Sequence, residues 1–275
     1  MNQALEYALS RPSRERTVLP LSDHDWDALR PRGLYWLLGR PLLNGVLLVV
    51  SLPFVALLVV PIALCVALSA GGVGKVLFIQ ERVGRRGRRF RLYKFRTMRD
   101  THRDLFSSWS EGDRGRTTRL GSLLRRSHLD ELPQILNILR GEMTFIGPRP
   151  EMLETHRFAL AHIPDFERRL SLRPGITGLA QVTVGYTGHD PDAYRAKFQA
   201  DEEYRLSFGL IQDLRVLWRT AGSTLRLQGG GDGARGPAQE RGSDSLPDLV
   251  LVPPAVERAS LATVAPAKSR SAVNS

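Results

Sequence analysis

The chain has 275 residues, and its 39 lysines and arginines against 28 aspartates and glutamates give a net charge of +11. This length holds one catalytic domain with extensions, and the charge favours anionic partners such as lipid headgroups, nucleotide phosphates or nucleic acid. The single cysteine, Cys65, excludes a disulfide framework and a cysteine-based zinc site.

The first predicted element is an apolar stretch over residues 42–70. At about 1.5 Å per residue it spans roughly 43 Å as a helix, which exceeds the about 30 Å of membrane hydrocarbon. Basic residues flank it on both sides, Arg32 before it and Lys75 after it among them, so the positive-inside rule keeps both ends in the cytoplasm. Pro53 and Pro61 are two possible bends, and the sequence does not choose between them. A kinked re-entrant helix is therefore predicted, with an ordinary single span as the alternative.

A basic run follows, with ten lysines or arginines and one acid between Arg82 and Arg103. Such a run suits a solvated face, a membrane-surface anchor or a nucleic-acid patch. Within it, apolar and basic side chains partly alternate over 90–96, which predicts a strand with one apolar side. Residues 100–116 are polar and predict a loop, in which His102 lacks partners at metal-ligand spacing.

Two adjacent carboxylates, Asp130 and Glu131, stand at the predicted start of an amphipathic helix. Its apolar side chains are spaced i, i+3, i+4 and i+7, namely Leu132, Ile135, Leu136 and Leu139. Because a proline deep in a helix forfeits a hydrogen bond, Pro133 belongs to the first turn, and the helix begins near Leu129 or Asp130. The N–H groups at a helix N-terminus attract anions and favour ionised carboxylates. The segment therefore suits the handling of a phosphate.

Two later turns each carry an arginine. In Gly147-Pro-Arg149-Pro150, the prolines restrict the backbone and would hold the guanidinium for bidentate phosphate contact. Arg173 precedes Pro174-Gly175, which fits a type II turn before a strand. Residues 192–227 predict mostly helix, with an apolar stripe over 206–218 that either lies flat on a membrane or closes the core.

Five blocks, in this order, resemble the bacterial sugar transferase family of polyprenyl-phosphate sugar-1-phosphate transferases. They are residues 76–84, 90–98, 124–134, 147–150 and 173–182. The resemblance covers roughly residues 40 to 228. It implies an α/β, mainly helical, monotopic membrane enzyme with a kinked re-entrant membrane helix and amphipathic interfacial helices.

The family's activity implies the substrates and the location. A sugar 1-phosphate would pass from a nucleoside diphosphate sugar, with a UDP-sugar expected, to polyprenyl phosphate, and UMP would be released. This step begins exopolysaccharide or glycoconjugate assembly at the cytoplasmic face of the bacterial inner membrane. The implied partners are these two substrates and membrane lipid, without nucleic acid.

The resemblance also assigns roles to individual residues. Asp130 is the nucleophile that forms an aspartyl-phosphosugar, and Glu131 helps to hold Mg²⁺ or to orient the pair, with Asp130 as a further metal ligand. Hard oxygen ligands favour Mg²⁺. The implied phosphate-binding residues are Lys94, Arg96, Arg125, Arg149 and Arg173.

The expected organisation has four parts. They are an N-terminal extension at 1–33, a membrane-inserted region at 34–74, a catalytic domain at 75–228 and a disordered tail at 229–275. Mixed charges before the apolar run argue against a cleaved signal peptide. The alternative function is a membrane-tethered basic scaffold that binds acidic polymer or nucleic acid through residues 82–103 without catalysis.

Overall fold

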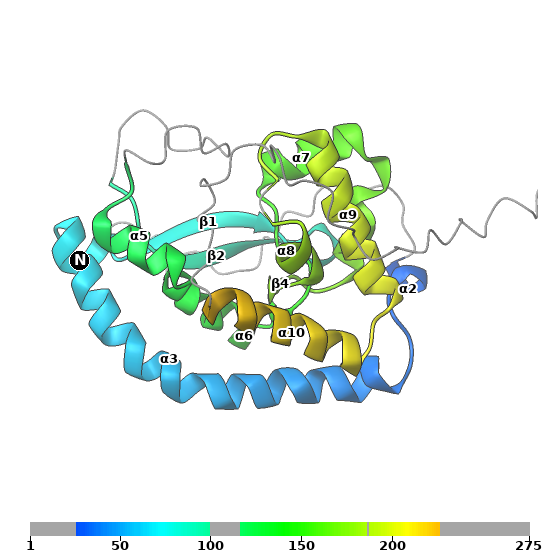
Figure 1. The fold of residues 1–275 in the computed structure, drawn as a ribbon, viewed down its shortest axis with the longest axis horizontal. Coiled ribbons are helices and arrows are strands. Elements are labelled where there is room, and N and C mark those ends of the chain that lie inside the picture. The colour runs from blue at the N-terminus through cyan, green and yellow to red at the C-terminus, as the bar shows by residue number, and fades with distance from the viewer. Residues whose placement is uncertain (1–25, 100–115, 186, 226–275) are drawn as a thin grey trace, which may run out of the picture. The chain divides into compact units, whose positions relative to one another are not determined.

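The computed structural model describes residues 26–99, 116–185 and 187–225. The helices and helical turns are α2 Trp26–Leu29, η1 Tyr35–Gly39, α3 Arg40–Ala70, η2 Val73–Lys75, η3 Arg85–Gly87, α5 Arg119–Arg126, η4 Leu129–Gln134, α6 Ile135–Leu139, α7 Leu153–His162, η5 Pro164–Ser171, α8 Leu179–Thr183, α9 Pro191–Leu206 and α10 Leu210–Leu225. The strands are β1 Leu77–Val83, β2 Arg89–Phe95, β3 Thr144–Ile146 and β4 Gly175–Thr177 (Figure 1). The predicted loop 100–116, except Arg116, most of the extension 1–33 and the tail 229–275 lie outside these residues.

Helix α3 is continuous and contains both Pro53 and Pro61. Each proline lacks the N–H that would bond the preceding turn, so each removes one hydrogen bond of the helix without ending it. Figure 1 shows α3 running along one edge of the described part and curving around it. Gly71, with φ of 75°, ends the helix in the left-handed conformation. Together with η1, the helix is long and apolar enough to cross a membrane by length and composition.

Helix α3 contacts the rest of the described fold near both of its ends. Arg40 Nη2 donates to the Ile146 carbonyl at 2.5 Å. One turn later, Asn44 Oδ1 accepts a hydrogen bond from Thr144 Oγ1 at 2.7 Å. Near the other end, Val66 is 1% exposed and packs in a cluster with residues of β2 and α5. The helix therefore contacts the same part of the fold near both of its ends.

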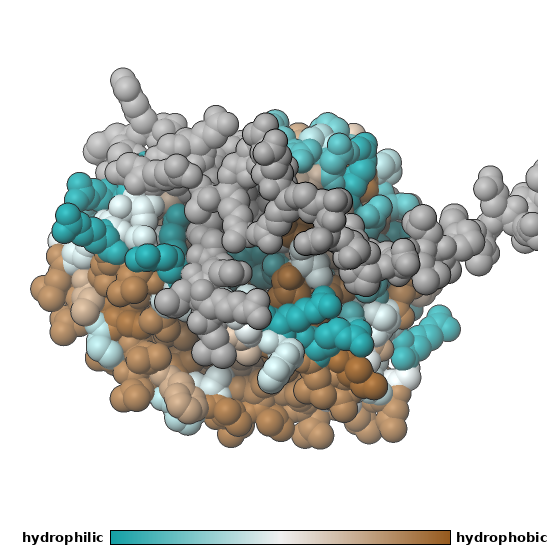
Figure 2. Space-filling view, viewed as in Figure 1, coloured by the Kyte–Doolittle hydropathy of each residue, from teal (hydrophilic) through white to brown (hydrophobic). Residues whose placement is uncertain are grey.

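Large exposed apolar side chains lie on η1, α3, α5, α6 and α10. Figure 2 shows a broad brown surface in the region where Figure 1 places α3 and α10. We call this set the apolar face: Leu37, Leu38, Leu42, Val46, Val49, Val50, Phe54, Leu57, Val60, Leu64, Leu68, Leu123, Leu136, Leu139, Leu210, Ile211, Leu214 and Trp218. Helix α10 has two different sides, because Val216 is fully buried whereas Trp218 is 82% exposed. The stripe at 206–218 therefore closes the core on one side and presents an apolar surface on the other.

The predicted strand at 90–96 is confirmed as β2. It pairs antiparallel with β1, from Leu77 opposite Phe95 to Val83 opposite Arg89. The hairpin turns through η3, where Arg86 and Gly87 have φ of 54° and 70°. The buried side chains Phe90, Leu92 and Phe95 alternate imperfectly with half-buried basic ones, as the sequence pattern indicated.

The second sheet pairs β3 with β4 in parallel, with Thr144 opposite Gly175 and Ile146 opposite Thr177. The strand after Arg173 is confirmed, but the type II turn is wrong, because Gly175 is not among the positive-φ glycines of the described residues. Close strand packing explains this glycine instead, since a Cβ there would lie 2.2 Å from the Gly147 nitrogen.

The carboxylate pair begins its helix at the predicted place but with a different pitch. Leu129 to Gln134 form a 3₁₀ turn, η4, and the α-helix α6 starts only at Ile135. A 3₁₀ turn has about 3.0 residues per turn, so it shifts the helix phase. Of the predicted apolar side chains, Ile135 is buried, whereas Leu136 and Leu139 are 40% and 54% exposed and belong to the apolar face.

Candidate active site

The predicted carboxylate Glu131 lies where three elements meet. Its Oε1 accepts hydrogen bonds from Lys94 Nζ of β2 at 2.8 Å and from Arg149 Nη2, which follows β3, at 2.9 Å. The side chains of Glu131, Lys94 and Arg149 are 11%, 12% and 23% exposed. Ion pairs this far from water are little screened. The structure therefore brings three of the sequence-predicted residues into direct contact.

Asp130 stands next to this cluster and is 7% exposed. Burial raises the pKa of its carboxyl to about 6, while Lys94 opposes the rise and the Glu131 charge adds to it. Burial alone would also raise the pKa of Glu131, but Arg149 and Lys94 outweigh it and hold that pKa well below its ordinary range. We expected the helix N-terminus to favour the ionised form of both carboxylates. The pKa of Asp130 is instead raised, so this expectation is wrong for Asp130. Opposite shifts in neighbouring carboxyls are typical of residues with different chemical roles.

Asn137 bonds the backbone of β2 next to Lys94, although the sequence analysis did not single it out. This side chain is fully buried in α6, and its Oδ1 accepts from the Tyr93 N–H at 3.3 Å. Its Nδ2 donates to the Arg91 carbonyl at 2.6 Å and to Glu142 Oε2 at 2.8 Å. An amide that bonds the backbone of β2 fixes the strand relative to the helix that carries the carboxylates. A polar residue inside the apolar segment Ile-Leu-Asn-Ile-Leu was the available signal.

Arg125 approaches the pair from α5. Its Nε donates to Thr97 Oγ1 at 2.9 Å, and its charge lowers the pKa of Asp130. Thr118 caps this helix by accepting from the Gly121 N–H at 2.9 Å. A Cβ at Gly121 would lie 2.0 Å from the Thr97 carbonyl oxygen, so the glycine permits the close contact. Helix α5 is thereby fixed against the chain just after β2.

The two remaining predicted arginines occupy other surroundings. The Arg96 N–H donates to the Val76 carbonyl at 2.9 Å, and its side chain is half-buried. Arg173 is exposed, and partial burial together with the Arg40 charge lowers its pKa. Neither arginine is among the principal charges that shift the pKa values of the carboxylate pair.

The donors suitable for Mg²⁺ are the two carboxylates. Within residues 26–99, 116–185 and 187–225, no group of three or more His, Cys, Asp or Glu could hold a metal on its own. Mg²⁺ usually takes one or two carboxylates and completes its shell with water and substrate phosphate. Both cations bond the Oε1 atom of Glu131, which leaves Oε2 with the donor chemistry that Mg²⁺ requires. The pair therefore fits such a metal when substrate phosphate is bound.

The basic run that begins at Arg82 is distributed over several partners. Arg82 donates to the Pro150 carbonyl at 3.0 Å, and Arg85 donates to the Ser171 carbonyl at 3.3 Å. Arg86 and Arg89 form ion pairs with Asp27 and Glu81, respectively. These basic side chains join elements of the fold, which disfavours a continuous scaffold surface for acidic polymer.

Residues 37–227 match the sequence model of the bacterial sugar transferase family. The chain is 36% identical over 218 residues to the UDP-glucose:undecaprenyl-phosphate glucose-1-phosphate transferase of Caulobacter vibrioides, covering 74% of this chain and 81% of the relative. It is 34% identical over 205 residues to the UDP-N-acetylgalactosamine-undecaprenyl-phosphate N-acetylgalactosaminephosphotransferase of Aeromonas hydrophila, covering 74% and 48%.

A third relative is the UDP-glucose:undecaprenyl-phosphate glucose-1-phosphate transferase of Xanthomonas campestris pv. campestris, which is 37% identical over 194 residues. That match covers 69% of this chain and 39% of the relative, so the chain spans less than half of two of these three proteins. The family model covers the chain from η1 through α10, including the carboxylate pair and its cations. The chain therefore belongs to the bacterial sugar transferase family.

Proposed function

We propose that this protein transfers a sugar 1-phosphate from a UDP-sugar to undecaprenyl phosphate, through a covalent intermediate on Asp130. The observation that carries the proposal is the buried carboxylate pair, in which Glu131 bonds Lys94 and Arg149 while Asp130 remains beside them. Relatives at 36% and 34% identity bear names that describe transfers from UDP-sugars to undecaprenyl phosphate. Such a reaction begins exopolysaccharide or glycoconjugate assembly.

The chemistry proceeds in two displacements at the phosphorus that bears the sugar. An Asp130 oxygen forms a bond to this phosphorus, the bridging P–O bond of the pyrophosphate breaks, and UMP leaves with the electron pair. A phosphate oxygen of undecaprenyl phosphate then attacks the same phosphorus and displaces the carboxylate. The products are undecaprenyl diphosphate sugar and the free Asp130 carboxylate.

The cations around the pair make this attack feasible. A pyrophosphate repels an anionic nucleophile, so its charge must be neutralised before Asp130 can approach. Lys94, Arg125 and Arg149 surround Asp130 closely enough to shift its pKa and supply this positive charge. When bound through Glu131 and Asp130, Mg²⁺ would add charge neutralisation at the phosphate oxygens.

The activity is tested with purified full-length protein, undecaprenyl phosphate, Mg²⁺ and a panel of UDP-sugars. Release of UMP that depends on both substrates supports the proposal, and the donor that turns over names the sugar. Absence of turnover with every donor contradicts it. Binding to nucleic acid that falls steeply with salt would then favour the basic scaffold.

We expect kcat/KM to depend on pH through Asp130. The nucleophile must be ionised, and its pKa is raised to about 6. Below that pH the rate should fall about tenfold per unit, and above it the rate should level off. Initial rates of UMP release between pH 5 and pH 8 measure this profile. A profile that is flat from 5 to 8 would mean that a different group attacks.

We further propose that the protein is monotopic and sits at the cytoplasmic face of the inner membrane, with its apolar face in the hydrocarbon. Arg40 and Val66, near opposite ends of α3, both contact the catalytic body. A helix held at both ends to one soluble body enters and leaves a membrane by the same side. Helix α10 presents Ile211 and Trp218 beside it, which suits an interfacial position.

The topology is tested by accessible cysteines. In a Cys65→Ala background, cysteines replacing the exposed Arg32 and Lys75 should both react with an impermeant maleimide from the cytoplasmic side. Labelling is measured in inside-out vesicles and in intact spheroplasts, and retained UMP release serves as the control for folding. Reaction of position 32 in spheroplasts and of position 75 only in inside-out vesicles would establish a full span.

A further inference from the structure

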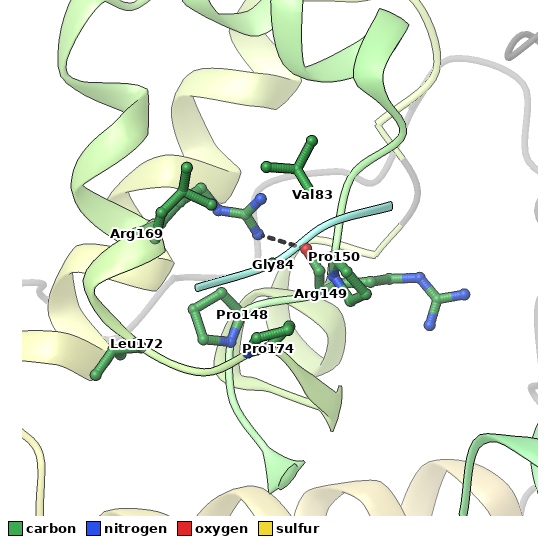
Figure 3. A pocket seen from close by; sticks show the side chains of 9 residues that line it. Val83, Gly84, Pro148, Arg149, Pro150, Arg169, Leu172 and Pro174 are labelled. Atoms are coloured by element: carbon green, nitrogen blue, oxygen red, sulfur yellow. Dashed lines mark hydrogen bonds between the residues drawn. The ribbon is translucent and has the colours of Figure 1, made fainter. Parts of the chain in front are cut away.

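Arg169 is a fully enclosed arginine that divides its donors among three groups. It lies in η5 and is 2% exposed. Its Nε donates to Asp201 Oδ2 at 2.7 Å, and its Nη1 is 3.6 Å from Glu151 Oε1. Its Nη2 donates to the backbone carbonyl of Arg149 at 2.8 Å, the contact drawn as a dashed line in Figure 3.

The partners of Arg169 form a closed ionic network. Glu151 also forms an ion pair with Lys197 of α9, and its Oε2 accepts from Thr155 Oγ1 at 3.1 Å. Burial alone would raise the pKa of Glu151, but Lys197 and Arg169 lower it to about 2. Two positive and two negative side chains are thus balanced inside the protein. Such a network is a poor source of net stability, since apolar side chains of similar volume often serve as well.

Arg169 also links this network to the backbone of the loop after β3. Three successive carbonyl groups of this loop accept hydrogen bonds: that of Arg149 from Arg169, that of Pro150 from Arg82 at 3.0 Å, and that of Glu151 from the Val83 N–H at 2.8 Å. In Figure 3 the Arg149 carbonyl faces Arg169 while its guanidinium points away. That guanidinium is the one that bonds Glu131.

We propose that Arg169 is a positioning residue. By holding the Arg149 carbonyl, it fixes the position of the Arg149 guanidinium beside Glu131. The inference rests on the proposed function, in which Arg149 neutralises substrate phosphate. A lysine at 169 keeps the positive charge but cannot bond Asp201 and the Arg149 carbonyl together, because it lacks the forked geometry of arginine. Misplacement of a binding group by about 1 Å can cost up to about 10²-fold in rate.

The test is a double-mutant cycle with Arg169→Lys and Arg149→Lys. If Arg169 acts through Arg149, Arg169→Lys should lower kcat/KM about 10- to 100-fold in the natural protein and by less than about threefold once Arg149 is lysine. The matched control is Arg205→Lys. Arg205 also pairs with an acid, Glu202, and donates to the Leu29 carbonyl at 3.0 Å. Within the described part of the chain, it makes no such contact with the loop after β3. Its effect should be small and equal in both backgrounds.

A second readout does not depend on turnover. Calorimetry measures the binding of UDP to the full-length protein in detergent, and Arg169→Lys should weaken this binding only when Arg149 is present. Additive effects in both assays, or equal losses from Arg205→Lys, overturn the inference. If Arg169→Lys does not fold, Asp201→Asn takes its place in the cycle with the same expectation.

The two proposals fail in different ways. A natural protein that binds UDP but releases no UMP contradicts the proposed transfer, while the binding cycle still decides the role of Arg169. A natural protein that does not bind UDP has no phosphate at Arg149, and the positioning role is then wrong.

Discussion

Asp130→Asn should lower UMP release by at least about 10³-fold, because an amide cannot form the acyl-phosphate on which both displacements depend. The replacement is nearly isosteric, so substrate binding should change far less than turnover. Initial rates at saturating UDP-sugar measure kcat, and UDP calorimetry measures the binding. Trapping the radiolabelled sugar phosphate on the protein gives a direct test, since the label should be absent from the variant. Turnover within about tenfold of the natural protein would contradict the covalent mechanism.

The stability of this variant supplies its control. The pKa of Asp130 is raised by burial from 3.8 to about 6, so between these values the folded protein holds a proton that the unfolded chain releases. The contribution of Asp130 to the stability of the natural protein therefore falls as pH rises through this window, by up to about 3 kcal/mol. Asp130→Asn should lack this fall and equal or exceed the natural protein in stability at pH 7. A lower thermal midpoint for the variant at pH 7 would mean that its lost activity reflects damage to the fold.

Glu131→Gln should lower kcat/KM by about 10²-fold through a different cause. The amide removes the charge that Lys94 and Arg149 share on Oε1, and it removes a carboxylate ligand for Mg²⁺. Leaving two buried cations without their anion should also destabilise the fold by about 3 kcal/mol. UMP release is measured against Mg²⁺ concentration, and raising Mg²⁺ should recover part of the rate, which it should not do for Asp130→Asn.

The matched control for this change is Glu142→Gln. Glu142 follows the same helix and accepts one hydrogen bond from Asn137 Nδ2 at 2.8 Å, which a glutamine oxygen can also accept. It should leave kcat/KM within about twofold, as is usual for a substitution away from the reacting groups. Equal losses from Glu131→Gln and Glu142→Gln would show that the effect is general to carboxylates on this segment. Glu131 would then have no special place in the reaction.

The sequence by itself determined the features that depend on local pattern. Residues 42–70 are apolar enough that only a long helix fits, and α3 covers all of them. The alternating segment 90–96 became β2, and the first turn at Pro133 began at Leu129 as its backbone restriction requires. The adjacency of Asp130 and Glu131 is read directly from the sequence. The family resemblance rests on the five short sequence blocks.

Only the tertiary structure decided how these pieces work together. Glu131 meets Lys94 across 37 positions and Arg149 across 18, and Arg169 reaches Asp201 across 32. Contacts at such separations depend on packing, which no local periodicity encodes. Packing also decided the opposite pKa shifts of the two carboxyls, because burial raises both pKa values and only at Glu131 do the contacts from Arg149 and Lys94 outweigh it. Packing likewise decided which apolar side chains of α6 are covered, since Ile135 is buried whereas Leu136 and Leu139 are exposed.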